Sequence, residues 1–490
     1  MTDVKALLVD LNNLSRYPTL GVGYLVAALR RADMAVEVLS PLLHGVPPYV
    51  RERPQNFGTH VKQRALFAMH PFVTPMRDQL RGRYLAQRRK ANPRVLQETG
   101  AAFAKRRPDV LLLSAYLDHR PSVVALCELA GAAGVPVILG GPAFHDPSVS
   151  REWLSIRGLT AIVGAEADFS LPDIVADLLA GNDLTKHHGV FLPDGRQGPP
   201  APPLTDLAAL PVPDFTDFPW HLYRTAVVPV MTGRGCSWGR CLFCSDIETA
   251  NGRTFRSRPL RAVLDEIAEQ TDRHQAKQVA FLDIKLNGDL DMWRGIADNF
   301  QSCVPGGTWV GTVHVQSRGV NGLGRDDLQR AYDSGMRRIS CGLETGSQRV
   351  NDRMAKGTDI SQTSTFIRDA HAVGLSVRTT MMLGYPGETS HDVAQTYRFL
   401  SDHEHMLDRI SMSPFKAIPG TRFARRHTSD PTRFPDLRDL KWDSGQATAT
   451  FQHEPPAPRA YRRERARVLN LVHRINSRDL RNQALEFDGV

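Results

Sequence analysis

Short, strand-like apolar runs alternate with helix-like segments along most of this 490-residue chain, and this alternation limits the fold more than any other feature. A β/α order of this kind predicts a parallel sheet with crossover helices. The runs in the first 185 or so residues are Lys5–Val9, Ala35–Leu39, Val110–Ser114, Val135–Leu139 and Thr160–Val163. We therefore expect a first α/β domain over residues 1–185.

The connection between the second and third of these runs is much longer than one helix. It extends over residues 41–108 and contains three basic clusters: Arg81-Gly82-Arg83, Arg88-Arg89-Lys90 and Lys105-Arg106-Arg107. Few aromatic residues are interleaved with the charges, so we interpret the segment as a solvated helical insert rather than a nucleic-acid-binding patch.

Proline separates this domain from the rest of the chain. Gly198–Pro203 and Leu210–Phe215 cannot continue a helix or a central strand, so residues 186–226 are predicted to be a linker. Six further strand-like runs follow, each with a helix-like segment behind it: Val227–Thr232, Gln278–Asp283, Trp309–Val313, Arg338–Leu343, Leu375–Leu383 and Arg409–Ser413.

Six β/α units around one core predict a partial (β/α)6 barrel at residues 227–420, with its active site at the C-terminal ends of the strands. Residues 421–490 are predicted to be mainly helical and to end in the arginine-rich helix Arg459–Arg481.

Composition excludes several classes of protein. No apolar stretch is long enough for a transmembrane helix, and the first residues lack the composition of a secretory leader. Six cysteines are too few for a disulfide scaffold, so we expect a reducing, cytoplasmic location. The net charge of +9, from 61 basic and 52 acidic residues, permits an anionic ligand without indicating nucleic acid or a membrane as partner.

The glycine-rich loop Gly233–Cys244 follows the first barrel strand directly and contains three cysteines: Cys236, Cys241 and Cys244. Its glycines let the backbone fold back so that the three sulfur atoms converge. Three ligands fit an iron–sulfur cluster with one open iron better than structural zinc, which requires four. Three merely packed cysteines are the weaker alternative here, whereas burial is the better interpretation for Cys127, Cys303 and Cys341.

This loop resembles that of radical S-adenosylmethionine (SAM) enzymes, in which an aromatic residue, here Phe243, precedes the last cysteine. Four residues separate its first two cysteines where most members have three. The resemblance implies that Cys236, Cys241 and Cys244 bind a [4Fe-4S] cluster whose open iron holds SAM, with Phe243 beside it.

Motifs on the later units extend the resemblance. Glu344 in Cys341–Ser347 would contact SAM, and Gly384 and Glu388 lie in the turn that would meet the adenine. Arg378 is a candidate for the SAM carboxylate, or else a strand-end arginine paired with an acid. The family's remaining motifs are represented by Met354–Gly357 and Pro419–Thr421.

The first domain resembles the Rossmann-like cobalamin-binding module that precedes the barrel in class B radical SAM enzymes. The matching segments are Leu20–Leu25, Ser114, Gly140-Gly141-Pro142 and, in part, Gly164-Ala165-Glu166. The fold class that this implies is α/β: a cobalamin-binding domain, a partial radical SAM barrel and a small, mainly helical C-terminal region. The implied cobalamin contacts are Asn12, Gly21, Ser114, Tyr116, Gly140, Gly141 and Glu166.

No histidine follows the first strand, where Asp10–Ser15 stands in place of the cobalt-ligating motif of other cobalamin domains. The lower face of cobalt is therefore expected to lack a loop imidazole and to be covered by Tyr116 and Leu117. His119 is more simply interpreted as a solvated loop residue.

The two modules together imply methylation of an unactivated sp³ carbon, using the 5′-deoxyadenosyl radical and methylcobalamin. The expected substrate is a natural-product or peptide intermediate, and the expected electron donor is a flavodoxin or ferredoxin. Cyclisation, ring contraction or another rearrangement without methyl transfer is the main alternative. A non-catalytic corrinoid or cluster carrier, and a radical enzyme with an empty first domain, remain open.

No catalytic residue is expected beyond the cluster ligands. Asp283, at the end of the second barrel strand, is predicted either to contact substrate or SAM or to cap a helix.

Overall fold

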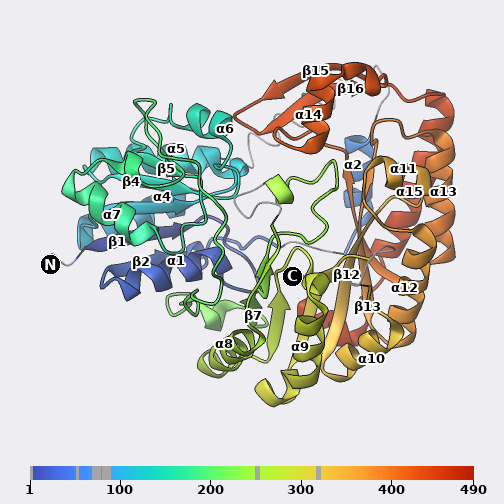
Figure 1. The fold of residues 1–490 in the computed structure, drawn as a ribbon, viewed down its shortest axis with the longest axis horizontal. Coiled ribbons are helices and arrows are strands. Elements are labelled where there is room, and N and C mark those ends of the chain that lie inside the picture. The colour runs from blue at the N-terminus through green and yellow to red at the C-terminus, as the bar shows by residue number, and fades with distance from the viewer. Residues whose placement is uncertain (1–3, 51–53, 69–78, 80–89, 249–253, 316–321) are drawn as a thin grey trace.

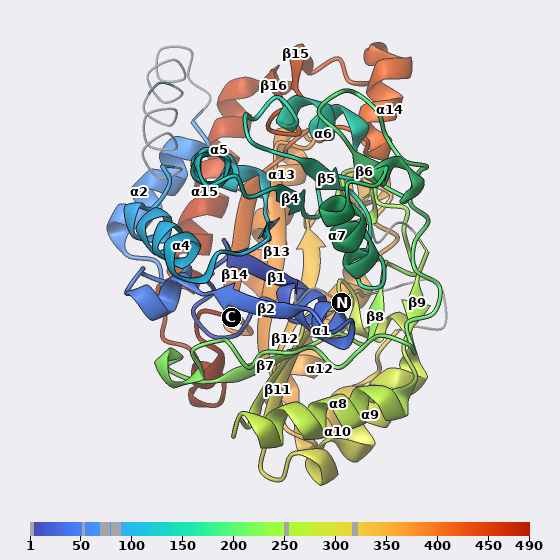
Figure 2. The same ribbon diagram turned by 90° about the vertical axis from the view of Figure 1, so that its left-hand side faces the viewer.

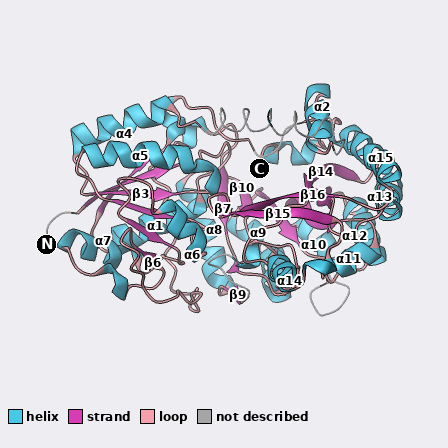
Figure 3. Cartoon of the chain, turned by 90° about the horizontal axis from the view of Figure 1, so that it is seen from above, coloured by secondary structure: helices cyan, strands magenta, loops and turns pink. Residues whose placement is uncertain are grey.

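A computed structural model describes residues 4–50, 54–68, 79, 90–248, 254–315 and 322–490. The basic cluster at 81–83 and most of the cluster at 88–90 lie outside the described residues. The described chain forms two α/β units that lie side by side along the long axis (Figures 1 and 3).

The N-terminal unit is built on a six-stranded sheet with the order β2-β1-β3-β4-β5-β6. Its first five strands are parallel and the short edge strand β6 is antiparallel. The strands are β1 (Lys5–Asp10), β2 (Ala35–Leu39), β3 (Val110–Ser114), β4 (Val137–Gly140), β5 (Ala161–Val163) and β6 (Val190–Phe191).

Helices cover both faces of this sheet, which is why its central strands are almost continuously apolar. Helices α1 (Leu20–Arg31) and α7 (Leu171–Ala180) pack on one face, and α4 (Pro93–Arg106), α5 (Arg120–Ala132) and α6 (Pro147–Trp153) on the other. The expected parallel sheet with crossover helices is confirmed, and the five predicted strands have bounds within two residues of the observed ones.

The insert between β2 and β3 does not form one cap. Its helix α4 packs on the N-terminal sheet, whereas α2 (Phe57–Leu66) reaches the second unit and lies against α15 (Pro458–Asn476). There the rings of His60 and His473 stack with their centroids 4.3 Å apart.

The second unit is a six-stranded, all-parallel sheet with the order β14-β13-β12-β11-β10-β7. The end strands β14 and β7 do not pair with each other, so the barrel is partial. Its strands are β7 (Val227–Val230), β10 (Gln278–Phe281), β11 (Thr308–Val313), β12 (Met336–Glu344), β13 (Ser376–Leu383) and β14 (Leu407–Pro414).

Helices follow the strands and cover the outer face of the barrel through one large apolar core. They are α8 (Leu260–Arg273), α9 (Leu290–Cys303), α10 (Arg325–Asp333), α12 (Ile360–Ala372), α13 (Ser390–Asp402) and, from the C-terminal region, α15. The short helix α11 (Gln348–Arg353) follows β12 and packs its Val350 in a separate cluster with Leu242 of the cysteine loop. Figure 2 looks onto the N-terminal sheet with barrel strands β12 to β14 behind it.

The C-terminal region is less helical than the sequence predicts. Between helices α14 (Arg422–Ser429) and α15 it forms an antiparallel hairpin of β15 (Leu437–Asp443) and β16 (Thr448–His453), which stands above the barrel (Figure 1). A short 3-10 helix at Asn482–Phe487 follows α15.

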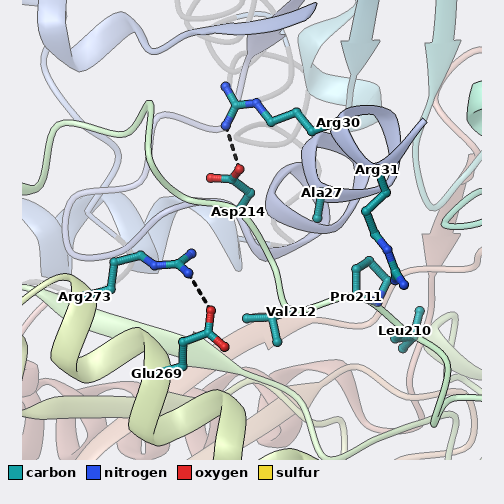
Figure 4. A pocket seen from close by; sticks show the side chains of 9 residues that line it. All are labelled: Ala27, Arg30, Arg31, Leu210, Pro211, Val212, Asp214, Glu269 and Arg273. Atoms are coloured by element: carbon teal, nitrogen blue, oxygen red, sulfur yellow. Dashed lines mark hydrogen bonds and ion pairs between the residues drawn. The ribbon is translucent and has the colours of Figure 1, made fainter. Parts of the chain in front are cut away.

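The proline-rich linker joins the two units along an outer cleft of about 560 Å³ between α1 and α8 (Figure 4). Asp214 forms an ion pair with Arg30, and Glu269 forms one with Arg273. The linker backbone is held on both sides, because Asp214 N donates to Gly23 O and Gln270 donates to Pro213 O. The residues that line this cleft therefore hold the linker between α1 and α8.

None of the helices in the described part of the chain is both long and apolar enough to cross a membrane.

Candidate active site

The cysteine loop leaves the barrel at the C-terminal end of β7 and is fixed from below by Asp283. The Asp283 carboxylate accepts hydrogen bonds from Thr232 N (3.0 Å), Thr232 Oγ1 (2.8 Å) and Gly233 N (2.9 Å). Burial raises the pKa of Asp283 to about 6. The structure thus gives Asp283 a third role, support of the loop, in place of the two expected from the sequence.

The far side of the loop rests on the segment after β12. Leu242 N donates to Met354 O (2.9 Å), and Trp238 Nε1 donates to Ala355 O (2.9 Å). Gly357 has φ +73°, and a Cβ there would lie 2.1 Å from the Trp238 ring. Only glycine fits this position, which explains why the motif Met354–Gly357 ends as it does.

The three loop cysteines are free thiols that sense one another electrostatically. Burial raises the pKa of Cys241 to about 11 and that of Cys244 to about 12; the charge of Cys236 adds to the first shift, and those of Asp246 and Cys241 to the second. Among the described residues, no group of three His, Cys, Asp or Glu side chains could hold a metal ion. A [4Fe-4S] cluster binds its thiolates at separate corners and so needs them farther apart than a single ion does.

Two buried lysines supply positive charge next to these thiols. Lys285 is 2% exposed, and its Nζ lies 2.9 Å from Ser237 Oγ, inside the loop. Lys356 is 7% exposed, and its Nζ lies 3.0 Å from Glu344 Oε1. Burial lowers the pKa of Lys285 to about 8, whereas for Lys356 the charges of Glu344 and Cys241 outweigh burial and raise the pKa.

Glu344 ends β12 in the left-handed region, at φ +62°, which is rare for a non-glycine residue. Its Oε1 accepts from Lys356 and from Thr380 Oγ1 (3.2 Å). A Cβ on Gly342 would lie 2.5 Å from Lys356 Nζ and 2.6 Å from Glu344 Oε1. The predicted SAM contact Glu344 therefore lies beside the segment that carries the cysteine loop.

The turn after β13 is held from within by Glu388. Its Oε2 accepts from Gly384 N (2.8 Å) and from Tyr461 OH (2.5 Å), and burial raises its pKa to about 7. Thr389, the next residue, caps α13 by accepting from Asp392 N. The carboxylate of Glu388 shapes this turn from below, and Gly384 is the candidate contact on the turn itself.

Arg378, the sequence candidate for the SAM carboxylate, lies away from the cysteine loop. Arg378 is the third residue of β13, and its Nη1 donates to Val490 O (3.0 Å). Five residues separate it from the end of the strand, a distance of about 17 Å. Its side chain lies toward the opposite end of the barrel, where neighbouring Arg338 binds the carbonyl of Phe487.

A cavity of about 300 Å³ lies at the carboxyl edge of the N-terminal sheet. Five of the seven predicted cobalamin contacts line it: Gly21, Ser114, Gly140, Gly141 and Glu166. Asn12 and Tyr116 are not part of its wall, and the Tyr116 side chain is 53% exposed. Two residues of the barrel unit, Met231 and Arg234, complete the wall.

Backbone geometry keeps this cavity open. Gly141 has φ +146°, and a Cβ there would lie 2.1 Å from Ala115 O, so no other residue fits. The carboxylate of Glu166 turns toward the barrel, where it accepts from Arg256 Nη1 (2.7 Å) and Leu204 N (2.6 Å). The wall therefore presents backbone and apolar groups to the cavity, with charge confined to one side.

The residues that form the cysteine loop and the later barrel strands also match a known family: residues 230–400 fit the model of the Radical SAM superfamily. The chain carries a radical SAM domain. The match begins at the last residue of β7 and ends in α13, so it contains the cysteine loop, Glu344 and the turn after β13.

Curated relatives of the chain are distant. It is 25% identical over 325 residues to an uncharacterized methyltransferase of Pyrococcus horikoshii (64% of this chain, 68% of that protein). It is 22% identical over 323 residues to the bacteriochlorophyllide d C-12(1)-methyltransferase of Chlorobaculum tepidum (64% and 65%). A putative methylthiotransferase of Methanocaldococcus jannaschii is 26% identical over 205 residues, 44% of its length.

Solved structures extend the likeness to almost the whole chain. The radical SAM methyltransferase TsrM from Kitasatospora setae, described with cobalamin and a [4Fe-4S] cluster bound, covers 96% of this chain and 91% of its own, with a TM-score of 0.67 and 14% identity. The cobalamin-dependent radical enzyme OxsB covers 94% of this chain and 66% of its own, with a TM-score of 0.68 and 15% identity. The expected order of a Rossmann-like sheet followed by a partial six-stranded barrel is thereby confirmed.

Sequence patterns missed several residues of the candidate site. Lys285, Arg234 and Arg256 lie near the cysteines or the cavity through contacts between segments far apart in the chain. Lys356 could have been predicted, because it lies within the motif Met354–Gly357. The sequence does not show its partner, however, since only the fold brings Lys356 beside Glu344.

Proposed function

We propose that the chain is a cobalamin-dependent radical SAM methyltransferase that methylates an unactivated sp³ carbon of a small-molecule or peptide substrate. The observation that carries this proposal is the shared wall of the two sites. Met231 and Arg234 line the N-terminal cavity and lead directly into the cysteine loop, so a ligand in the cavity would face the radical site.

The residues of the loop fit an iron–sulfur cluster. Three thiols on one loop, with buried Lys285 and Lys356 close to them, form a donor set whose negative charge is compensated locally. Cys236, Cys241 and Cys244 would hold the cluster. Lys356, rather than Arg378, would meet the SAM carboxylate, and Glu344, whose Oε1 lies 3.0 Å from Lys356 Nζ, would lie next to the SAM amino group.

When bound, the cluster and SAM supply one-electron chemistry, and cobalamin supplies a transferable methyl group. The chain contributes position and exclusion of water. Gly384 would present backbone to the adenine, while Gly140 and Gly141 let the wall approach a flat macrocycle closely.

Thr380 pairs with Ser411 on the neighbouring strand. Side chains alternate along a strand, and Ile410 and Met381, next to these two residues, pack in the core under the outer helices, so Thr380 and Ser411 face the lumen of the barrel. Both inward side chains are exposed, and Thr380 Oγ1 reaches Glu344. We assign this hydroxyl-lined wall to the substrate, which would place the substrate beside the SAM site.

The relatives support methyl transfer, since two of those above are named methyltransferases. A rearrangement without methyl transfer is the second candidate, because the fold of the cobalamin-dependent radical enzyme OxsB fits this chain as well as that of the methyltransferase TsrM. An electron donor such as a flavodoxin or ferredoxin is proposed for either reaction.

The test is anaerobic reconstitution of the full chain with iron, sulfide and hydroxocobalamin, followed by incubation with methyl-deuterated SAM, a reductant and candidate substrates. Mass spectrometry would show a product that has gained a deuterated methyl group. A product of unchanged mass would favour rearrangement. A chain that retains no corrinoid after reconstitution would contradict both reactions.

A further inference from the structure

Four charged residues join the two units at the wall of the cavity: Glu166 and Asp168 from the N-terminal unit, and Arg234 and Arg256 from the barrel unit. We call them the domain clamp. Asp168 receives both Nη atoms of Arg234, each at 2.8 Å, and Glu166 Oε2 lies 2.7 Å from Arg256 Nη1. Arg234 Nη1 also lies 3.4 Å from Glu166 Oε1, so the two pairs form one network.

The domain clamp is buried. The exposed fractions of its four side chains lie between 3% and 8%. A buried ion pair gives little net stability compared with apolar packing, but it fixes geometry and leaves a costly unpaired charge when one partner is removed. A two-pronged arginine–carboxylate pair is also the most directional ion pair available. The network is therefore suited to positioning.

One side of the clamp leads straight to the cysteines. Arg234 and Arg256 are direct partners in the antiparallel ribbon β8 (Gly233–Arg234) and β9 (Arg256–Ser257). Gly235, between Arg234 and Cys236, has φ +83° and would place a Cβ 2.3 Å from Thr254 O. The chain between the clamp and the first cysteine thus has little freedom.

The other side of the clamp forms the cavity. Glu166, Asp168 and Arg234 all line it, and the Arg234 guanidinium lies over the ring of Tyr24, another lining residue, at 5.7 Å. A ligand that fills the cavity therefore touches the same side chains that hold the base of the cysteine loop.

We propose that the domain clamp couples the two sites: filling of the cavity by a corrinoid orders the cysteine loop through Asp168–Arg234 and Glu166–Arg256. These four are positioning residues, since they act through the loop backbone. The inference rests on the proposed function in one respect, namely that the cavity is the corrinoid site.

Hydrogen exchange measured by mass spectrometry tests the coupling on the full chain with its cluster reconstituted, using hydroxocobalamin as the probe. In the native chain we expect slower exchange in two regions: the cavity edge at residues 114–116 and 140–142, and the loop at residues 232–247, where exchange slows about tenfold. In Asp168→Asn, hydroxocobalamin should still slow exchange at the cavity edge. Most of the tenfold slowing of exchange in the loop should be lost.

Arg234→Lys keeps the charge but loses the two-pronged contact, and it serves if Asp168→Asn does not fold; it should weaken the loop effect in the same way. Asp265→Asn, which breaks the exposed pair Arg261–Asp265 on α8, is the matched control and should behave as the native chain. No protection at the cavity edge in the native chain would contradict the proposed function. Protection there without protection of the loop, or an unchanged loop effect in both clamp variants, would overturn the coupling alone.

Discussion

The cysteine loop and the N-terminal cavity, which together form the candidate site, are built in different ways. The loop is surrounded by directed polar contacts: Asp283 below it, Trp238 on its far side, and Lys285 and Lys356 beside the thiols. The cavity is shaped mostly by glycine backbone and apolar strand ends. A site that holds a metal cluster through a few ligand bonds needs particular side chains at fixed positions. A site that encloses a large ring needs mainly space, which small residues such as glycine leave.

The largest effect that would separate the two regions is expected from the loop cysteines. Cys241→Ser should abolish iron binding and reduce turnover by about a thousandfold or more, because a ligand has no substitute at that position. Iron content and turnover measure the loss. Corrinoid binding should persist, and Cys303→Ser, outside the loop, should retain iron. Full iron content in Cys241→Ser would remove the loop from the account.

The opposite change fills the cavity. Gly21 lines it, and a Cβ there meets nothing within 4 Å, so a large side chain at Gly21 would enter the space without backbone strain. We expect Gly21→Trp to weaken hydroxocobalamin binding by about a hundredfold or more, equivalent to about 2.7 kcal/mol. Absorbance titration measures it, with Gly21→Ala as control. Iron content should stay at the native level; if corrinoid affinity were unchanged, the cavity would not be its site.

Within the loop region, Lys356 tests the charge next to the thiols. Lys356→Met leaves Glu344 and the neighbouring thiolates without their cation, so SAM affinity should fall about 10- to 100-fold, as for other residues that support a metal site. Equilibrium binding of SAM to the reconstituted chain gives the value. The exposed Lys277 provides the control variant Lys277→Met. Equal SAM affinity in the two variants would contradict the assignment of Lys356.

The last effect is on stability rather than on binding and concerns Glu388, whose folded-state pKa of about 7 exceeds that of an exposed glutamic acid. Between about pH 4.5 and 7 the folded chain binds more protons at this site than the unfolded chain, so this contribution to stability falls as pH rises through that window, by at most about 3 kcal/mol. Glu388→Gln removes the titration. The melting temperature of the native chain should therefore fall relative to that variant from pH 5 to pH 8, and a constant difference would contradict it.

Sequence patterns predicted what local order determines. The parallel strands, the Pro-rich linker and the cysteine loop follow from periodicity, proline and cysteine spacing. The candidate contacts Glu344 and Gly384 come only from the resemblance to radical SAM motifs. Sequence patterns failed where the position of a residue along its strand decides which end of the barrel its side chain reaches. Arg378 lies on the expected strand, yet it stands five residues too early to reach the loop, and only the three-dimensional placement of Val490 reveals its partner.

The C-terminal region shows a second limit. Its hairpin of β15 and β16 separates two helices in a stretch expected to be mainly helical, and Tyr461 from α15 reaches Glu388 beneath the turn after β13. Contacts of this kind join segments about seventy residues apart and leave no local pattern. The domain clamp could not be predicted from the sequence for the same reason. Asp168 and Arg234 lie in different units, and only the fold shows that they form an ion pair.

The central claim is that one chain holds a corrinoid and an iron–sulfur cluster in two sites that share a wall. The most direct measurement is the iron, corrinoid and zinc content of the anaerobically reconstituted, gel-filtered chain, with Gly21→Trp and Cys241→Ser measured alongside. We predict about four irons and about one corrinoid per native chain, with loss of corrinoid alone in the first variant and of iron alone in the second. Zinc in place of iron, or no retained corrinoid, would contradict the claim.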